Sequence, residues 1–454
     1  MPKHTEWMHS KGGRAGVKGE HTHAARKLLG ELKNQLALGG IKSGSMRTLL
    51  DDGTLIEASV SMNIPSVRII PTGGGTTGSR TYETYAYIVE SENVHVVKLG
   101  KYASADYDGA PLTETQHEMV YEKTISIGVD EDCVAIAVDS TRDRAFVSIY
   151  NGVGSDRIVM INTADNTVVK DFRPPGPYLS FRPFLLSIDE ATGDVYNHAA
   201  YANSDRSNIS RLNPDTGVFS DMPYTELTHT ITDIFFNKNK KLYSLLDSLT
   251  SKLSSLDAKT LARLDFVSFD GGFYRIAVSP DGKLLFFTGY DSSISVPYRD
   301  FIGVVDLATG ALIKRIYGKS INTHGQSLQH LSVSSDSKKL AVISATTDDM
   351  LFLFDIEKIL SIRNIFAPSD LIQDGLSVIY GVRSATSTVS SFNEVKFAPD
   401  NKRCYVPSWE QSPKGYWFYC CNVDSHAIDS RVELPTRVTY IRPFGVSILV
   451  RRTS

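Results

Sequence analysis

The feature that most constrains how this chain can fold is a hairpin pattern that recurs along its length. The stretch FYRIAVSPDGKLLFFTGYD, which begins at Phe273, holds two short apolar runs separated by the residues Ser279–Gly282. Apolar, β-branched runs on either side of such turn residues predict an antiparallel β-hairpin. Related stretches, each with a turn of Asp, Asn, Ser, Gly or Lys, begin at Val134, Phe184, Ile231, Leu328 and Phe392. The chain is therefore predicted to be built from a repeated β unit.

A second hairpin pattern follows each copy of the first. It is clearest as ISRLNPDTGVFS from Ile209 and GVVDLATGALIKRI from Gly303, where the turn glycines can adopt a positive φ. The remaining copies begin at Ile158, Leu253, Leu351 and Phe418. Each unit thus holds four predicted strands, and the units repeat with a period of roughly 42 to 65 residues. This strand number and period are typical of the blades of a β-propeller.

Two segments resemble a known family, the YVTN/NHL-like β-propellers. They are IAVSPDGKLLFF, which begins at Ile276, and GVVDLATGALIKRI, which begins at Gly303. The resemblance covers roughly Val129 to Leu434 and implies the propeller fold. Because this architecture serves many unrelated tasks, the resemblance does not imply a particular function.

Six full units leave a fragment of a blade at each end of the repeat. The first fragment is TYAYIVESENVHVVKLG, from Thr84, with MVYEKTISIGV, from Met119; the second is RVTYIRPFGVSILVRR, from Arg437. Pairing the C-terminal strand with the N-terminal strands would close the ring and remove two open sheet edges. We therefore predict an all-β fold in which residues 81–454 form a propeller of about seven four-stranded blades, closed by N- and C-terminal strands. Six or eight blades are the alternatives.

Residues 1–44 do not follow the repeat and are predicted to form a basic arm with an amphipathic helix. Lys and Arg outnumber Glu in this arm, although the whole chain has a net charge of −3. Within HTHAARKLLGELKNQLALGG, four leucines recur at helical spacing on one side, namely Leu28, Leu29, Leu32 and Leu36. This apolar stripe predicts docking on another subunit or partner, and packing on the chain's own propeller is the alternative.

Residues 45–80 are predicted to form a small β-module followed by a linker. Asp52-Gly53 is a strong hairpin signal, VRII before Pro71 predicts a third strand, and TGGGTTGSR has the composition of a linker. A short basic arm followed by LLDDGTLIEASVSMNIPSVRI resembles, in style, the virion proteins of tailed bacteriophages. The resemblance implies a place in a virion or tail.

Bulk composition excludes several classes of protein. The 454 residues are 41% hydrophobic and 22% charged, which favours a large core over disorder. The slightly negative net charge provides no general field for nucleic acid, and no apolar run approaches the length of a membrane helix. The first residues lack an apolar stretch typical of a secretion signal. We therefore expect no sequence-specific nucleic-acid binding, no membrane span and no classical export.

Motifs for catalysis or cofactors are missing from the sequence. G-x-S-x-G, the P-loop, H-E-x-x-H and the EF-hand loop do not occur. His229, His324 and His330 precede first strands and could converge on a metal near the axis, but loop histidines are the simpler interpretation. The sequence accordingly predicts no catalytic residue, no cofactor and no metal. The recurrent turn aspartates are expected to bond their own backbone two residues on; they are Asp139, Asp189, Asp281, Asp336 and Asp400.

The stretch PSWEQSPKGYWFYCC is unusually aromatic. Trp409, Tyr416 and Trp417 lie around its Pro-Lys-Gly turn, and tryptophan is favoured at interface hot spots. These three residues are candidates for partner docking, with packing in the core as the alternative. The four cysteines form no C-x-x-C pair and are predicted to be buried free thiols in a reducing compartment.

These features predict a non-enzymatic structural or assembly protein whose rigid propeller is a docking platform. A bacteriophage tail or virion component is the specific expectation, with other protein subunits, including copies of itself, as partners. It would lie in the virion if viral and in the cytoplasm otherwise. The alternatives are a cellular scaffolding or binding propeller and a propeller enzyme, such as a lactonase or a quinoprotein-like oxidoreductase.

Overall fold

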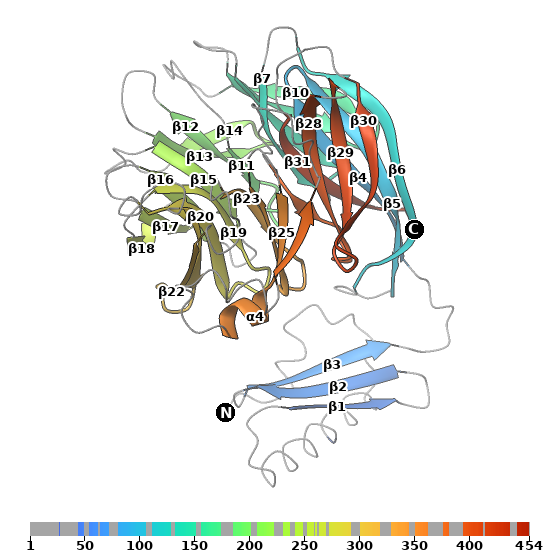
Figure 1. Ribbon diagram of the computed structural model, residues 1–454, viewed down its shortest axis with the longest axis vertical. Coiled ribbons are helices and arrows are strands. Elements are labelled where there is room, and N and C mark those ends of the chain that lie inside the picture. Colours follow the sequence, from blue (N-terminus) through green and yellow to red (C-terminus); the bar gives the residue numbers. More distant parts are fainter. Residues whose placement is uncertain are drawn as a thin grey trace. The chain divides into compact units, whose positions relative to one another are not determined.

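The structure is a computed structural model, shown in Figure 1. It describes residues 27, 44–49, 54–61, 64–71, 80–105, 111–128, 132–150, 156–173, 185–200, 207–221, 230–236, 241–247, 252–257, 259–260, 263–268, 272–291, 300–317, 328–344, 350–361, 376–380, 394–411, 414–435 and 443–453. By its internal contacts the chain divides into two compact units. One comprises Met1–Arg80 and Ser104–Pro111, and the other comprises Thr81–Ala103 and Leu112–Ser454.

In the described part of the second unit, six four-stranded antiparallel sheets are each built from four consecutive strands. The first sheet holds β7 (Asp132–Asp139), β8 (Arg144–Tyr150), β9 (Arg157–Asn162) and β10 (Thr167–Phe172). The second holds β11 (Leu186–Ile188), β12 (Val195–Ala200), β13 (Ser207–Asn213) and β14 (Val218–Asp221). The third holds β15 (Thr230–Phe236), β16 (Lys241–Asp247), β17 (Lys252–Asp257) and β18 (Arg263–Ser268). The fourth holds β19 (Gly272–Val278), β20 (Leu284–Tyr290), β21 (Asp300–Asp306) and β22 (Ala311–Tyr317). The fifth holds β23 (Leu328–Val333), β24 (Lys339–Ser344), β25 (Met350–Asp355) and β26 (Leu376–Tyr380). The sixth holds β27 (Lys396–Phe397), β28 (Arg403–Gln411), β29 (Lys414–Asn422) and β30 (Ala427–Leu434).

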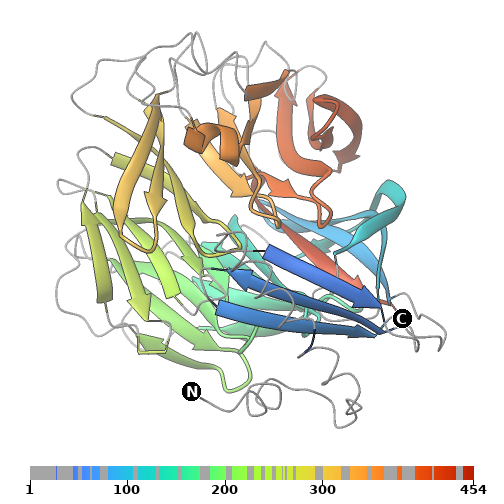
Figure 2. The same cartoon turned by 90° about the horizontal axis from the view of Figure 1, so that it is seen from below.

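A further four-stranded sheet joins the two ends of the repeat. The C-terminal strand β31 (Pro443–Arg452) pairs antiparallel with β4 (Arg80–Glu90), which is followed by β5 (Asn93–Ser104) and β6 (Thr113–Ser126). Figure 2 shows the sheets following the order of the sequence around a ring. The prediction of an all-β propeller with four-stranded blades, closed by strands from both ends, is confirmed. The ring consists of the six consecutive-strand blades and this closing sheet.

The first hairpin turn of five blades has the predicted aspartate chemistry. In each, the Asp Oδ1 atom accepts a hydrogen bond from the backbone N–H two residues on, at 2.9 to 3.1 Å. The five acceptors are Asp139, Asp189, Asp281, Asp336 and Asp400. The prediction that these carboxylates stabilise their own turns is therefore confirmed.

The second hairpin turn of a blade is tied to the first by a backbone hydrogen bond. Leu307 N–H donates to the carbonyl of Lys283 at 2.9 Å, and Thr163, Ile356 and Val423 make the same bond in other blades. The four-strand unit is thus held together at its turns as well as along its strands.

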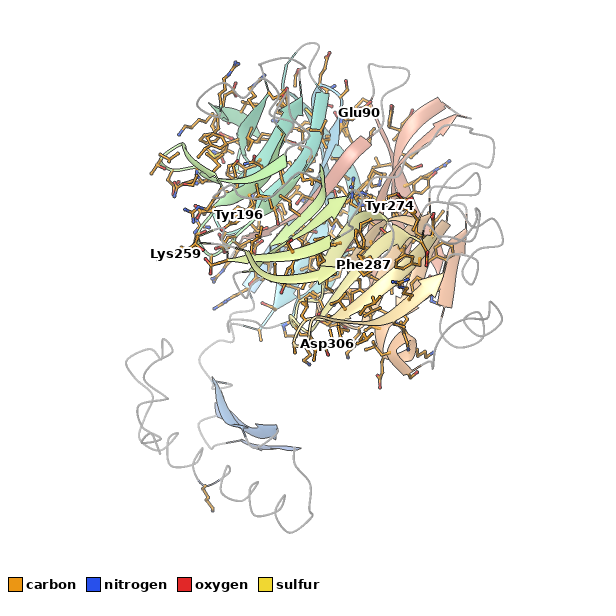
Figure 3. The ribbon with its side chains drawn as sticks, turned by 90° about the vertical axis from the view of Figure 1, so that its left-hand side faces the viewer. Glu90, Tyr196, Lys259, Tyr274, Phe287 and Asp306 are labelled. Carbon is orange, nitrogen blue, oxygen red and sulfur yellow. The ribbon has the colours of Figure 1, made fainter. Side chains whose placement is uncertain are left out.

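The hydrophobic core lies between successive sheets. One buried cluster joins β19–β22 to β23–β25, and another joins the closing sheet to β7–β9. Phe287 on β20, labelled in Figure 3, is fully buried. Its ring packs edge-on against Phe273 and Phe301, with centroids 5.0 and 5.6 Å apart. Each blade therefore buries both of its faces against its neighbours, which explains why the strands are apolar on both sides.

One predicted β segment is partly helical. The stretch LFLFDIEKILSI contains β25 and then the helix α4 (Ile356–Ser361). Asp355 Oδ1 accepts the N–H of Lys358 at 3.2 Å, as an N-cap residue does, and Ile356 and Ile359 are buried one helical turn apart. The expectation of a simple second hairpin in this blade was wrong, because a cap and an i,i+3 apolar pair favour a helical turn.

The first unit contains a three-stranded antiparallel sheet of β1 (Gly44–Leu49), β2 (Thr54–Ser61) and β3 (Ile64–Pro71). These strands lie where the sequence predicts the β-module. Of residues 1–43, the structure describes only Lys27, which is helical, so the rest of the predicted arm lies outside the described residues. Within the described residues, no helix is long and apolar enough to cross a membrane.

Candidate functional site in the central cavity

The first strand of each four-stranded sheet contributes to one cavity of about 840 Å³ at the centre of the ring. Its lining comes from β7, β11, β15, β19, β23, β27 and β31, together with the turns that follow several of these strands. This central cavity is of the size that small-molecule sites have in proteins. We therefore treat it as the candidate site.

Local irregularities in the first strands turn side chains toward the cavity. The pairing of β19 with β20 shifts register between Phe273 and Arg275, and that of β23 with β24 shifts between Leu328 and His330. Equivalent shifts occur in β7, β15 and β31. A bulge inserts one residue into a strand and re-aims the next side chain. Arg275 and His330, which directly follow the shifts, both line the cavity.

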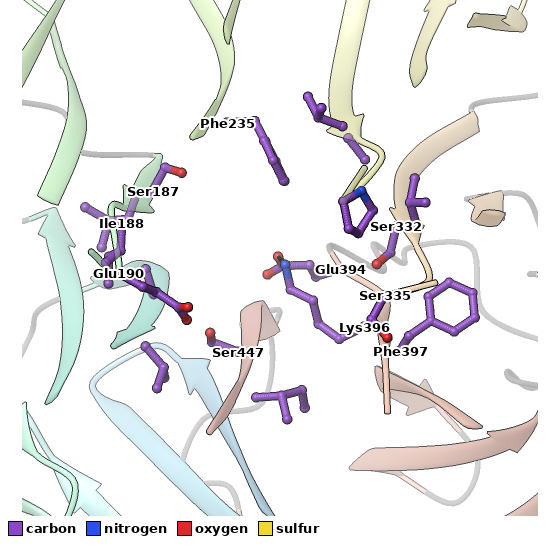
Figure 4. Close-up of a pocket in the computed structure, with 18 of the residues that line it drawn as sticks. Ser187, Ile188, Glu190, Phe235, Ser332, Ser335, Glu394, Lys396, Phe397 and Ser447 are labelled. Carbon is purple, nitrogen blue, oxygen red and sulfur yellow. Dashed lines mark ion pairs between the residues drawn. The ribbon is translucent and has the colours of Figure 1, made fainter. Parts of the chain in front are cut away.

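Arg275, His330, Glu394 and Lys396 form what we name the polar wall of the cavity. Arg275 donates its Nε–H to His330 Nε2 at 2.9 Å. Lys396 Nζ lies 2.5 Å from Glu394 Oε1, while Glu394 Oε2 accepts the backbone N–H of Val446 on β31 at 2.8 Å. Figure 4 shows Lys396 extending into the cavity toward Glu394. The wall thus spans three neighbouring blades and is tied to the closing sheet.

His330 is held in its neutral form. Desolvation lowers its pKa well below 6.5, and the positive charges of Arg275 and Lys396 lower it further. Because Nε2 accepts the hydrogen bond from Arg275, the single ring proton is assigned to Nδ1. The Arg275 guanidinium also donates from Nη1 to the carbonyl of Tyr274 at 3.0 Å, so the polar wall combines donors on Arg275, His330 and Lys396 with the acceptor Glu394.

The side of the cavity across from the polar wall is mainly apolar. Ile188, Ile234 and Phe235, on β11 and β15, line this side, and Figure 4 shows Phe235 reaching into the cavity. Glu190, in the turn after β11, lies on the same side. Enclosure raises the pKa of its carboxyl, with a further contribution from Asp139 and Asp189. The lining of the cavity therefore combines apolar side chains with charged groups of both signs, namely the basic Arg275 and Lys396 and the acidic Asp189, Glu190 and Glu394.

The predicted docking residues are placed only in part. Leu28, Leu29, Leu32 and Leu36 lie outside the described residues, as do His229 and His324. Trp409 lies in β28, but its side chain is not described. No group of three or more metal-ligating side chains is formed within the described residues.

The two other aromatic candidates belong to β29 and pack within the propeller. Tyr416 is 2% exposed and is part of the core between the sixth blade and the closing sheet. Its burial leaves no surface for a partner, which agrees with the core-packing alternative. Trp417 is half-buried, and the Arg431 guanidinium lies 4.3 Å from the centroid of its ring. A docking role for Trp417 stays a prediction.

Arg275, Glu394 and Lys396 were not predicted from the sequence as site residues. Their position relative to the turns could have identified two of them. Arg275 stands four residues before Ser279, the first turn residue of its blade. His330 and Glu394 stand at the same distance before Ser334 and Ala398. Aligning the hairpins on their turns would have placed these residues at one level of the ring. Only His330 was noted, and it was considered as a metal ligand.

Comparisons with known proteins identify the fold alone. No protein-family model matches the sequence, and no curated protein is similar to it in sequence. The structure is similar to hydrazine synthase from Kuenenia stuttgartiensis, with a TM-score of 0.52, 11% identity, and coverage of 71% of this chain and 96% of that one. It is also similar to a candidate 6-phosphogluconolactonase from Bacteroides uniformis, with a TM-score of 0.52, 12% identity, and coverage of 81% and 99%. At such low identity the likeness is one of architecture.

Proposed function

We propose that this propeller is a non-enzymatic assembly protein, a rigid platform on which other protein subunits dock. The observation that carries the proposal is the distribution of exposed apolar side chains. Among the described residues, five of the six large apolar side chains that are exposed lie on outermost strands: Val120, Val168, Val169, Val218 and Ile313. Their exposed fractions are 42 to 57%. Outermost strands also have unpaired backbone groups, so an apolar outer edge suits the addition of a strand or face from another subunit.

The division of the chain into two units supports a second docking element. Residues 1–80 and 104–111 form a unit with its own internal contacts. The apolar stripe of Leu28, Leu29, Leu32 and Leu36 is not part of the repeated sequence pattern that builds the ring. A single short helix is marginally stable in water and gains stability by packing. We propose that this stripe packs on another subunit, most simply a second copy of the chain.

Removing the arm tests this part of the proposal. Deleting residues 1–40 is expected to leave the propeller's melting temperature nearly unchanged, because the blades bury their core without the arm. The same deletion should abolish oligomerisation or incorporation into a larger particle. Light scattering coupled to size-exclusion chromatography and thermal denaturation measure the two properties on the same samples.

A matched pair of substitutions sharpens the test. Leu32→Asp places a charge in the apolar stripe, whereas Asn34→Asp places the same charge on the opposite side of the predicted helix. Leu32→Asp should weaken assembly and Asn34→Asp should not. If the truncated chain unfolds several degrees lower and still assembles, the stripe belongs to the propeller's own core and the docking proposal fails.

The specific proposal is that the particle is a bacteriophage tail or virion. It is supported by the resemblance in style of the basic arm and the segment LLDDGTLIEASVSMNIPSVRI, about 70 residues in all, to tailed-phage virion proteins. Genes for portal or tail proteins next to the gene for this chain are the expected finding. Neighbouring genes of ordinary cellular metabolism would instead favour a cellular scaffold.

A further inference from the structure

A hydrogen bond between side chains ties the fourth blade to the fifth beside the central cavity. Arg275 on β19 donates its Nε–H to Nε2 of His330 on β23 at 2.9 Å. The same guanidinium donates from Nη1 to the carbonyl of Tyr274 at 3.0 Å, so its position on β19 is fixed. An arginine has donors but no acceptor. The tie between the two blades therefore exists only while Nε2 of His330 carries no proton.

We infer that this tie makes the joint between the fourth and fifth blades an acid-sensitive switch. A proton at Nε2 of His330 removes the acceptor for Arg275 and places two positively charged donors against each other. The edges of β19 and β23 that face the cavity then separate. This regulation goes beyond docking and assembly, and it does not depend on them.

The two charges that act on His330 oppose a proton there. Arg275 approaches from β19 and Lys396 from β27, and both side chains are positive. Burial, together with these charges, lowers the pKa of His330 well below 6.5. On its own sheet His330 lies opposite Ile343 of β24, and toward β20 and β21 its strand buries Leu331 in an apolar cluster. These neighbours therefore favour the neutral imidazole.

The carboxylates that line the same cavity are engaged elsewhere or belong to another blade. Glu394 Oε2 accepts the backbone N–H of Val446 on β31 at 2.8 Å, and its Oε1 atom lies 2.5 Å from the Lys396 ammonium. Asp189 accepts hydrogen bonds within its own turn, and Glu190 follows it there, in the second blade. If Glu394 turned to a protonated imidazole, the closing strand would lose its acceptor. Acid therefore releases a tie of the ring in either arrangement.

The direction of the pH dependence follows from the neutral form of His330. The imidazole of an unfolded chain takes up its proton near pH 6.5, whereas the folded chain excludes that proton until well below this value. The stability that depends on the neutral imidazole is therefore fully present above pH 6.5 and is lost as the pH falls below it. One such proton lowers the folding equilibrium constant by up to about tenfold per pH unit.

The apolar contact between the two blades confines the change to the edge that faces the cavity. Leu328 and Leu331 on β23 belong to one buried cluster with Phe286, Ile302 and Val304 of the fourth blade. These side chains do not titrate, so they hold the blades together at every pH. Acid is therefore expected to loosen β19 and β23 locally before the propeller unfolds.

Hydrogen exchange of the full wild-type chain tests where the switch lies. Exchange is followed by mass spectrometry at pH 7.5 and pH 5.0 and is corrected for the intrinsic dependence of amide exchange on pH. Peptides of β19 and β23 are expected to open about tenfold or more often at pH 5.0, because each opening exposes an imidazole that takes up a proton. Peptides of β7 and β8, in the first blade, should change much less. This measurement needs no variant and is independent of any effect of a substitution on folding.

Two variants then identify the group that titrates. His330→Gln keeps an acceptor for Arg275 but has no proton to gain. Between pH 7.5 and pH 5.5 the folding equilibrium constant of the wild type should fall about tenfold more than that of His330→Gln, as urea denaturation would measure. His426→Asn removes an exposed histidine from a turn with a positive φ, which asparagine also adopts, and should keep the wild-type dependence on pH.

Three results would overturn the inference. The first is an equal pH dependence of stability in the wild type and His330→Gln. The second is unchanged exchange of β19 and β23 at pH 5.0. The third is an equal rise of exchange in every blade, because that rise would show a loss of global stability in place of a switch at one joint.

Discussion

At the scale of single residues, the cysteines show how position in a sheet controls reactivity. Cys133, Cys404, Cys420 and Cys421 are free and buried, as the sequence predicts. Cys404 lies directly opposite Cys421 in the pair β28–β29. The Cys404 thiol donates to the carbonyl of Cys421 at 3.8 Å. The neighbouring Cys421 side chain and burial raise the pKa of Cys404 well above 9, and burial raises the pKa of Cys420 to about 12. Thiols with raised pKa values remain protonated at neutral pH.

These pKa shifts predict thiols that do not react in the folded protein. Alkylation requires the thiolate, and a thiol with a pKa near 12 is ionised in about one molecule in ten thousand at pH 8. Iodoacetamide at pH 8 should therefore leave Cys404 and Cys420 unmodified in the folded chain. All four cysteines should react in denaturant, as intact mass spectrometry would show. Rapid modification of Cys404 or Cys420 without denaturant would contradict the buried positions.

At the scale of elements, the pair β20–β21 depends on one glycine. Phe287 lies directly opposite Gly303 in the register of these strands. A Cβ atom at Gly303 would lie 2.0 Å from Cζ of the Phe287 ring, which is fully buried. The ring therefore covers the glycine, and the absence of a side chain at Gly303 sets the position of the aromatic group.

The substitution Gly303→Ala is expected to destabilise the protein by about 2 to 3 kcal/mol, because overpacking forces the Phe287 ring out of its site. Chemical denaturation would measure the change. A second substitution, Phe287→Leu, should recover part of the loss, so that the double variant is more stable than the sum of the single changes predicts. Simple additivity of the two changes would show that the ring and the glycine are not coupled.

At the scale of the whole molecule, the closing sheet determines whether the ring exists as one body. Strand β31 pairs with β4 from Pro443 to Arg452, and Val446 and Leu449 on it are fully buried. The Arg451 guanidinium also reaches the next blade, where its Nε atom lies 3.2 Å from Asp143 Oδ1. The two ends of the repeat are thus joined by backbone pairing, by apolar burial and by an ion pair.

Deleting residues 443–454 should lower the melting temperature of the whole propeller. The deletion removes the first strand of the closing sheet and, with it, the buried side chains of Val446 and Leu449. Burying one such side chain contributes about 1.5 to 3 kcal/mol to the free energy of unfolding. Deleting only residues 453–454 is the control and should have little effect. A synthetic peptide of residues 443–454, added to the truncated chain, should restore part of the melting temperature. An unchanged melting temperature after the longer deletion would mean that the ring does not depend on closure.

The sequence by itself determined the repeated unit. Turn residues, short apolar runs and incomplete end fragments are local signals, so they predicted four-stranded blades and closure by both ends, which the structure has. The short helix α4 was missed because its cap, Asp355, and its pair of isoleucines follow an apolar run that also suits a strand. The tertiary structure alone decided the polar wall. Arg275 and His330 are 55 residues apart in sequence, and Glu394 follows after 64 more, so no local pattern joins them. They meet because equivalent positions of neighbouring blades face a common axis once the ring closes.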